Sequence, residues 1–234
     1  LTYHIIPSKV STYDILRAIK KGKGKIPLKT MAGKYLIASL DGKKIILTDV
    51  DGVLLDWEWA FNVWMQEHGF ELTDGYQYEY DMATRYGISK EQVRKLIRTF
   101  NESAAIGFLP VLRDAMYWVK RLHEQHGYQF YAITSLSLNK NAGKLREMNL
   151  EKMFGKTAFS KVLCLDTGAD KTEALQPYTD SGCWWIEDKP ENAAVGLVLG
   201  LKPLLMEHGH NMNYEVDYPI VKNWEDIYRL VTKV

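Results

Sequence analysis

The stretch KKIILTDVDGVLLDWE, residues 43–58, decides the fold. Its apolar run at residues 45–47 is rich in β-branched side chains, which is typical of a buried parallel strand. Asp49 and Asp51 follow where this strand ends, and Gly52 lets the chain turn away. Open α/β sheets carry their chemistry just beyond the carboxyl ends of their strands. The two carboxylates are therefore candidate site residues, and the alternative is an ordinary acidic turn.

The two carboxylates also predict a cation. Acidic groups at one strand end repel each other unless a positive group lies between them. Mg²⁺ is a hard cation that prefers oxygen ligands, so it suits aspartate side chains. We therefore expect Mg²⁺ as the cofactor of a site at this strand end.

The composition is that of an ordinary globular protein, with 234 residues, 46% hydrophobic and 25% charged. The net charge of +1 gives no global field that favours a nucleic acid or a membrane as partner. No apolar run has the length of a membrane span and no secretory leader pattern opens the chain, so we expect a cytoplasmic protein. Cys164 and Cys183 fall in apolar strand-like runs, which predicts buried reduced thiols.

Residues 1–42 are predicted to form an N-terminal extension of the core. Ser11 ahead of the apolar residues 15–19 predicts a short capped helix, and residues 34–40 predict a strand. We interpret the basic run KKGKGK at residues 20–25 as a solvated linker, and the alternative is contact with phosphates. We expect this extension to pair with the sheet or to cover it.

Residues 57–108 predict a small helical cap inserted after the first motif. Its first helix carries aromatic side chains at helical spacing, namely Trp57, Trp59, Phe61 and Trp64. Ser89 and Gln92 form a capping box ahead of another helix. Residues 43–56 and 109–234 then make up the core domain.

Helical and strand patterns alternate in the second half of the chain. A helix from Pro110 to Gly127 leads into a strand at residues 128–134. Further strands are predicted at residues 161–165, 183–186 and 203–206, and helices at residues 140–147, 171–175 and 190–199. Repeated βα units predict the α/β class, with a parallel sheet flanked by helices.

Polar side chains follow the later strands at the same predicted edge. Thr134 and Ser135 supply hydroxyls, Lys171 supplies an ammonium, and Glu187 and Asp188 supply a second acidic pair. Hydroxyls and ammonium groups bind phosphate oxygens, and a second acidic pair can complete a metal site. Each residue alone is more often a local cap or an exposed side chain. Together with the first acidic pair, they predict a metal-dependent phosphate site.

These four strand ends resemble the motifs of the haloacid dehalogenase superfamily of phosphohydrolases. DVDGV resembles the first motif, Thr134 the second, Lys171 the third and Glu187-Asp188 the fourth. Within the superfamily, the chain is most similar to the 5'(3')-deoxyribonucleotidase and related 5'-nucleotidase family. The similar segments are DVDGVLLDWE, Thr134-Ser135, Asp170-Lys171-Thr172, IEDK at residues 186–189 and His210-Asn211. The extension, and Glu187 where an aspartate is common, depart from that family's pattern.

The resemblance implies a Rossmann-like sheet in the order 3-2-1-4-5, counted from the strand at residues 43–49. It also implies that Asp49 is the nucleophile that forms an aspartyl-phosphate, and that Asp51 is the general acid and base. An acid at position 51 favours hydrolysis of a phosphate monoester within the superfamily.

The resemblance also supplies ligand sets for the metal and the phosphate. Mg²⁺ is expected on Asp49, the Asp51 carbonyl and Asp188, with Glu187 helping directly or through water. The phosphate-binding residues are Thr134, Ser135 and Lys171.

The cap aromatics bear on the substrate. Trp57 falls where the nucleotidase family has an aromatic residue against the base, and Phe61, Trp64 or a cap tyrosine could form the opposite wall. The alternative is that these aromatics pack the cap onto the core. The histidines at 208 and 210 are interpreted as loop residues near the site entrance.

The leading hypothesis is a Mg²⁺-dependent 5'-nucleotidase that acts on deoxynucleoside or nucleoside monophosphates. The alternatives are a phosphatase for another small monoester or for a nucleic-acid terminal phosphate, and a non-catalytic binding module. The expected partner is a small phosphorylated substrate, and the sequence leaves monomer and homodimer open.

Overall fold

In this computed structural model, the described residues are 28–29, 35–36 and 44–233. The chain divides into two compact units after residue 43. In the first unit, β1 (Leu28–Lys29) pairs antiparallel with β2 (Tyr35–Leu36), where the sequence predicts a strand. The predicted helix at residues 11–19 and the basic run at residues 20–25 lie outside the described residues.

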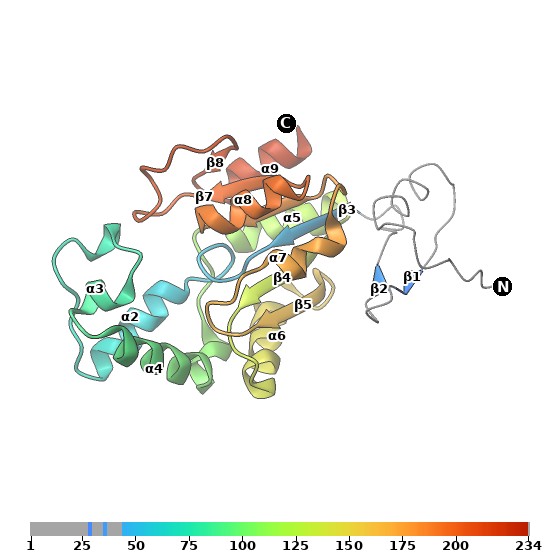
Figure 1. The fold of residues 1–234 in the computed structure, drawn as a ribbon. Coiled ribbons are helices and arrows are strands. Elements are labelled where there is room, and N and C mark those ends of the chain that lie inside the picture. The colour runs from blue at the N-terminus through green and yellow to red at the C-terminus, as the bar shows by residue number, and fades with distance from the viewer. Residues whose placement is uncertain (1–27, 30–34, 37–43, 234) are drawn as a thin grey trace. The chain divides into compact units, whose positions relative to one another are not determined.

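The second unit is built on a six-stranded parallel sheet in the order β5-β4-β3-β6-β7-β8 (Figure 1). The strands are β3 (Lys44–Thr48), β4 (Tyr128–Ser135), β5 (Phe159–Leu165), β6 (Trp184–Glu187), β7 (Lys202–Met206) and β8 (Ile220–Val221). The first five strands have the predicted order 3-2-1-4-5, which confirms the fold class. The sixth strand, β8, extends the sheet beyond β7.

The strand that opens the first motif lies inside the sheet. Ile46 of β3 is fully buried and pairs with Phe130 of β4 on one side and with Trp184 of β6 on the other. A strand that is covered on both faces needs a continuous apolar run, which β3 has. Its carboxyl end therefore opens at the middle of the sheet edge.

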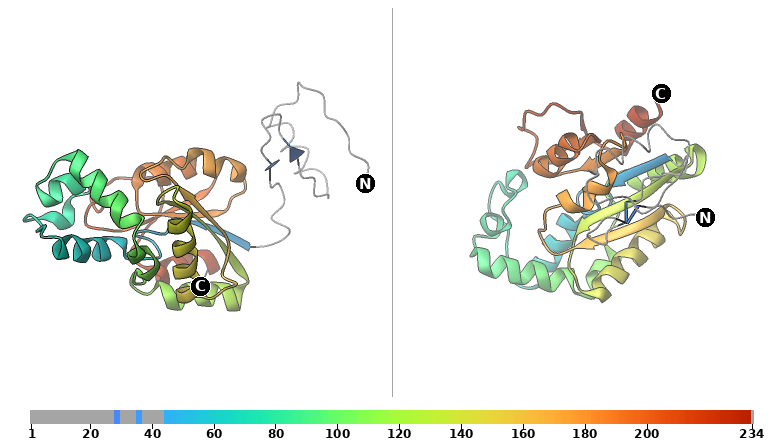
Figure 2. Two further views of the ribbon diagram at one scale, coloured as in Figure 1. Left: turned by 90° about the horizontal axis from the view of Figure 1, so that it is seen from below. Right: turned by 45° about the vertical axis from the view of Figure 1, so that its right-hand side comes forward.

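Helices cover both faces of the sheet (Figure 2). They are α5 (Ala115–His126), α6 (Lys140–Phe154), α7 (Thr172–Leu175), α8 (Pro190–Val198) and α9 (Trp224–Thr232). Right-handed crossovers from β3 to β4 and β5 put α5 and α6 on one face, where α5 also contacts α9. The chain then returns to β6 and builds outward in the other direction, so α8 lies on the opposite face and contacts α7.

Two helices differ from the prediction in a simple way. The helix predicted at residues 140–147 continues to Phe154, because Leu150 and Phe154 extend its buried face until Gly155 ends it. The helix α9 was not predicted, although Asn223 caps it by accepting a hydrogen bond from the Asp226 amide.

The segment predicted as the cap, which keeps that name below, contains α2 (Trp57–Glu67), η1 (Tyr76–Tyr78), α3 (Met82–Tyr86), α4 (Lys90–Asn101) and η2 (Ala104–Phe108). Figure 1 shows α2, α3 and α4 as a group beyond one edge of the sheet. The Ser89 hydroxyl accepts a hydrogen bond from the Gln92 amide and so starts α4 as predicted.

Two short segments join the cap to the core. The Asp56 amide donates to the Pro110 carbonyl at 2.9 Å, and the Leu112 amide donates to the Leu54 carbonyl at 2.9 Å. The segments that enter and leave the cap are therefore hydrogen-bonded to each other.

Candidate active site

Asp49 is the first residue beyond β3, and its carboxyl group is fixed from two sides. Its backbone amide donates to the Ile186 carbonyl at 2.8 Å, which ties the position to β6. Its Oδ1 accepts a hydrogen bond from the Val50 amide at 2.7 Å. Burial raises the pKa of Asp49 to about 7, against the lowering effect of Lys171, while the nearby acids Glu187 and Asp51 raise it further.

A tight turn follows Asp49. The amides of Leu54 and Leu55 both donate to the Val50 carbonyl, at 2.8 and 2.9 Å. Gly52 has a φ of +73°, and a Cβ there would lie 2.4 Å from Oδ2 of Asp188. Glycine is therefore required at position 52, both by the backbone conformation and because Asp188, which follows β6, approaches so closely.

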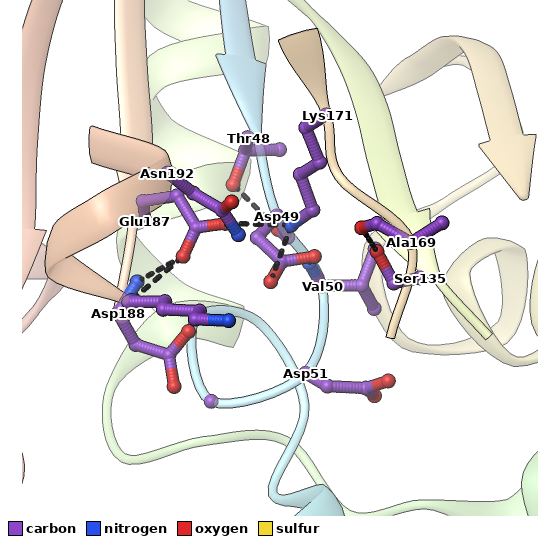
Figure 3. A network of polar contacts seen from close by, with 12 residues as sticks. Thr48, Asp49, Val50, Asp51, Ser135, Ala169, Lys171, Glu187, Asp188 and Asn192 are labelled. Carbon is purple, nitrogen blue, oxygen red and sulfur yellow. Dashed lines mark hydrogen bonds and ion pairs between the residues drawn. The ribbon is translucent and has the colours of Figure 1, made fainter. Parts of the chain in front are cut away.

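Lys171 lies between two carboxylates (Figure 3). Its Nζ is 2.7 Å from Asp49 Oδ2 and 2.7 Å from Glu187 Oε1, and the residue is 1% exposed. Burial acts to lower the pKa of Lys171, but the charges of Asp49 and Glu187 outweigh it and raise the pKa above its usual value. The lysine therefore stays charged at the foot of the site.

Glu187 is fully buried and its two oxygens accept four hydrogen bonds. Oε1 accepts from Lys171 Nζ and from Asn192 Nδ2, and Oε2 accepts from the amides of Asp188 and Lys189. Burial acts to raise the pKa of Glu187, but Lys171 and these donors outweigh it and lower the pKa. Glu187 therefore carries a negative charge that is already compensated by protein groups.

Asp188 faces Asp49 from the end of β6. Ligand oxygens of Asp49, Glu187 and Asp188 lie within 4.8 Å of one another. Burial, and then the charges of Glu187 and Asp49, raise the pKa of Asp188 well above its usual value. Asn211 holds this strand end, because its Nδ2 donates to the Asp188 carbonyl at 2.7 Å.

This donor set fits a hard divalent cation. Carboxylate oxygens are the ligands that Mg²⁺ prefers. Burial, and after it the charges of the neighbouring acids, raise the pKa of Asp49 and of Asp188, and a bound cation would offset both effects. Because the Glu187 oxygens already accept four hydrogen bonds, Asp49 and Asp188 are the side chains that remain open for a metal.

The hydroxyl pair at the end of β4 divides into two roles. Thr134 is fully buried, and its Oγ1 has no hydrogen-bond partner within the described part of the chain. A buried hydroxyl without a partner is costly, so it is available to a ligand atom. Ser135 Oγ instead donates to the Ala169 carbonyl at 2.9 Å, which ties β4 to the loop before Lys171.

Asp51 is turned away from the acidic cluster. Figure 3 shows its side chain pointing away from Asp188. Its two oxygens are 2.5 and 3.0 Å from Nη1 and Nη2 of Arg146, a fully buried residue of α6. The predicted acid and base thus lies two residues from the predicted nucleophile, and it is held by Arg146, which no local sequence pattern singles out.

The cavity above these residues has a volume of about 820 Å³. Its floor is formed by the strand ends, including Asp49, Asp51, Thr134, Lys171 and Asp188. Its walls come from the cap and from the loop after β7, including Trp57, Tyr80, Arg85, Arg94, His208 and His210. The site residues that the sequence predicted in the core domain all line the cavity except Glu187; those that line it are Asp49, Asp51, Thr134, Ser135, Lys171 and Asp188.

The three predicted cap contacts lie in different places. Trp57 lines the cavity, and its Nε1 donates to Asn101 Oδ1 at 2.9 Å. Phe61 has no exposed surface and stacks beneath Trp57 with ring centroids 4.7 Å apart. Trp64 packs on Phe61 and on His68, and is not among the cavity residues. Phe61 and Trp64 therefore pack within the cap, and neither is among the cavity residues.

The histidine loop after β7 contacts both the core and the cap. His208 Nε2 donates to the Gly52 carbonyl at 2.6 Å, and burial lowers the pKa of His208. The rings of His208 and His210 stack 5.5 Å apart, and the His210 ring lies 5.1 Å from that of Tyr80 in the cap. Both histidines lie in the loop after β7, and both line the cavity.

Two polar residues of the site escaped the sequence analysis as functional candidates, namely Arg146 and Asn192. Arg146 lies 95 residues from its partner Asp51, and no local pattern joins them. Asn192 was the one with a usable signal, because it follows the fourth strand end by one helical turn, at the start of α8.

Known structures share this architecture. A haloacid dehalogenase-like hydrolase from Streptococcus pneumoniae aligns over 82% of this chain and 100% of its own, with 17% identity and a TM-score of 0.56. A protein described as a predicted phosphatase from Clostridium acetobutylicum aligns over 82% and 99%, with 14% identity and a TM-score of 0.58. The fold is that of the haloacid dehalogenase-like hydrolases. Another protein with this fold is D,D-heptose 1,7-bisphosphate phosphatase from B. bronchiseptica, complexed with magnesium and phosphate (81% and 98% covered, 11% identity, TM-score 0.51).

Sequence comparison adds one relative. An uncharacterized 32.4 kDa protein of Enterobacteria phage T4 is 31% identical over 139 residues, which are 57% of this chain. The match covers 49% of that protein, so the chain spans about half the length of this curated relative. No protein-family model matches this chain. None of its described helices is both long and apolar enough to cross a membrane.

Proposed function

We propose that this chain is a Mg²⁺-dependent phosphomonoester hydrolase of the 5'-nucleotidase type. One observation carries the proposal: the buried Asp49 carboxyl group, paired with Lys171 at 2.7 Å, opens onto a cavity whose floor also holds Asp188 and a hydroxyl without a partner in the described chain. Phosphoryl transfer needs a nucleophile, a positive charge and a hydrogen-bond donor for the phosphoryl oxygens, and Asp49, Lys171 and Thr134 could supply these three at this site.

The reaction divides into two displacements at phosphorus. In the first, an Asp49 oxygen attacks phosphorus, the bond from phosphorus to the leaving oxygen breaks, and Asp51 gives that oxygen its proton. In the second, Asp51 takes a proton from water, the water oxygen attacks phosphorus, and the bond to Asp49 breaks. The products are an alcohol and inorganic phosphate, and both aspartates return to their starting states.

Protein donors take up the charge that spreads over the phosphoryl oxygens. Lys171 supplies a permanent positive charge, and its position is fixed by Glu187 from behind. Thr134 supplies a hydroxyl that has no competing partner among the described residues. Donors that are already oriented stabilise the transition state without reorganisation.

Mg²⁺ would be held by the side chains of Asp49 and Asp188 and by the Asp51 carbonyl. When bound, it supplies positive charge that offsets the repulsion between the phosphate and the carboxylates. Magnesium and phosphate together in the structurally similar heptose bisphosphate phosphatase support this assignment.

The dimensions and walls of the cavity support a nucleotide as the substrate. A volume of about 820 Å³ is within the usual range for a bound small molecule and leaves room beyond a phosphate group. Trp57 offers a ring whose orientation is fixed by the hydrogen bond to Asn101 and by stacking on Phe61. A fixed aromatic ring is suited to stack on a nucleobase.

The proposal is tested by phosphate release over a panel of nucleoside monophosphates and sugar phosphates with Mg²⁺. We expect turnover of nucleoside monophosphates, abolished by Asp49→Asn. A beryllofluoride adduct at Asp49, detected by ¹⁹F NMR, provides a second readout that a non-catalytic binding module would not give. No release from any monoester by folded, Mg²⁺-loaded protein would overturn the proposal.

A further inference from the structure

Asp51 is held by a buried arginine from the opposite side of the site. Both terminal nitrogens of Arg146 contact the Asp51 carboxylate, Nη1 at 2.5 Å from Oδ1 and Nη2 at 3.0 Å from Oδ2. The Arg146 side chain has no exposed surface, whereas that of Asp51 is 21% exposed and lines the cavity. This two-point contact fixes both the position and the plane of the carboxylate.

Arg146 belongs to α6, which packs against η2 at the end of the cap. Asn149, one turn further along the same helix, is also buried, and its Nδ2 donates to the Leu109 carbonyl at 3.1 Å in the segment that leaves the cap. Gly107 allows the cap to approach the same helix, because a Cβ there would lie 3.1 Å from the Leu145 side chain. The guanidinium thus projects from a well-packed helix toward the turn after β3.

The burial of Arg146 calls for an explanation. Removing a guanidinium from water costs free energy, even when the group is paired. An arginine at the surface could have paired with Asp51 at a smaller desolvation cost. Arg146 Nε also has no hydrogen-bond partner in the described portion of the chain. The protein therefore buries a cation at a cost in free energy, and this cation contacts Asp51 of the first motif.

We propose that Arg146 is a positioning residue that holds Asp51 in the place from which it exchanges protons with the leaving oxygen and with water. The inference rests on the proposed function. Lys171 and a bound cation would otherwise attract the Asp51 carboxylate into the acidic cluster, where it would act as one more anion. Arg146 gives it a competing partner on the far side of the turn.

The proton balance of the reaction is unchanged by Arg146. In the first displacement, the oxygen of Asp51 that carries the proton faces the leaving oxygen, while the other oxygen stays on the guanidinium. In the second, the same free oxygen takes the proton of water. Arg146 keeps all its protons throughout, and its two-point contact becomes one-point during each transfer.

Substrates whose leaving groups differ in their need for a proton distinguish a positioning role of Arg146 from a purely structural one. An alkoxide needs a proton as it leaves, whereas 4-nitrophenolate does not. With Arg146→Gln, we expect the single-turnover rate of phosphate transfer from a nucleoside or sugar monophosphate to fall about 100-fold. The burst of 4-nitrophenolate from 4-nitrophenyl phosphate should stay within about threefold of the unmodified protein. Arg146→Lys, which keeps the charge but loses the fork, should be intermediate.

Asn149→Ala is the matched control. It removes a buried hydrogen bond from the same helix, so it should lower the melting temperature and leave the ratio of the two single-turnover rates unchanged. Asp51→Asn should reproduce the ratio of Arg146→Gln, and the double variant should add no further change, because Arg146 acts through Asp51.

The outcomes are distinct. If the unmodified protein and Asp51→Asn differ in leaving-group dependence but Arg146→Gln and Arg146→Lys behave as the unmodified protein, the role of Arg146 is wrong and the proposed function stands. If the unmodified protein transfers no phosphate from any monoester, the proposed function itself fails. If Arg146→Gln does not fold by circular dichroism, the comparison between Arg146→Lys and Asn149→Ala decides.

Discussion

Glu187 and Lys171 form an ion pair of 2.7 Å in which the two side chains are 0% and 2% exposed. The same ammonium lies 2.7 Å from Asp49, so one cation is shared between the predicted nucleophile and a carboxylate that has no exposed surface. Because the other acceptor positions of Glu187 bind Asn192 and two backbone amides, its charge serves to hold Lys171. We therefore infer that Glu187 positions Lys171, whereas the resemblance implies that it helps to hold the metal directly or through water.

Glu187→Gln should therefore affect Lys171 more than the metal. We expect the free energy of unfolding to fall by about 3 kcal/mol, since a buried cation loses one of its two counter-charges. We expect kcat for phosphate release to fall about 10- to 100-fold, because Lys171 loses its fixed position. Chemical denaturation and steady-state kinetics measure the two effects.

Asp188→Asn provides the comparison for metal binding. It should weaken Mg²⁺ binding by more than about tenfold, measured by calorimetry, whereas Glu187→Gln should change it only a few-fold. Equal losses of Mg²⁺ affinity in the two variants would show that Glu187 ligates the metal and that our interpretation of its hydrogen bonds is wrong.

Thr134 should contribute to catalysis at a cost in stability. Thr134→Val removes a buried hydroxyl that has no partner in the described residues, so the ligand-free protein should be as stable as the original or slightly more stable. The variant should lose about 10- to 100-fold in kcat/KM, the usual value of one hydrogen bond to a charged group. Thr134→Ser keeps the hydroxyl and should retain most of the activity. A large loss of stability in Thr134→Val would contradict this role.

The sheet, and the edge where its polar residues gather, could be predicted because most of the core strands have a recognisable local sequence pattern. The run before Asp49 and the runs before Thr134 and Glu187 are apolar and end in polar residues, and parallel strands bring such ends together. The order 3-2-1-4-5 then followed from the resemblance and is confirmed. β8 has two residues, too few for a periodic pattern to reveal it.

Contacts between distant elements could not be predicted. Arg146 looks like any polar residue of an amphipathic helix, and only the fold brings it to Asp51. In the cap, Trp57, Phe61 and Trp64 share a helical face, but exposure separates them: Phe61 is fully buried while Trp57 lines the cavity. Helical spacing predicts which side chains share a face of the helix, but it does not predict which of these rings borders the cavity.

The metal-free protein should become less stable as the pH rises from about 4 to about 7. Burial raises the pKa of Asp49 from 3.8 to about 7, so the folded state keeps a proton that the unfolded state has lost in this window. The stabilisation is complete below the unfolded value and is lost as the pH passes the folded value. Melting temperatures without metal across this range, in the presence of a chelator, measure the slope, and Asp49→Asn should reduce it.

Mg²⁺ should compete with the same proton. Its dissociation constant should fall by about tenfold per pH unit for each proton released, up to about pH 7. The rise in melting temperature on adding saturating Mg²⁺ should therefore be larger at pH 7.5 than at pH 5. A shift independent of pH would mean that the cation binds away from Asp49.

Trp57 should determine the preference for a nucleobase. Trp57→Ala should reduce kcat/KM for nucleoside monophosphates by about 5- to 150-fold, the range of one base stacked on an aromatic ring, and leave 4-nitrophenyl phosphate nearly unaffected. Loss of the Trp57 ring also frees Asn101 and uncovers Phe61, so cap stability will fall for a separate reason. Trp64→Ala is the matched control, because it removes a ring of similar size from the same helix outside the cavity residues. It should lower cap stability without changing the ratio between the two substrates, and an equal change of that ratio in both variants would show that Trp57 acts through cap packing alone.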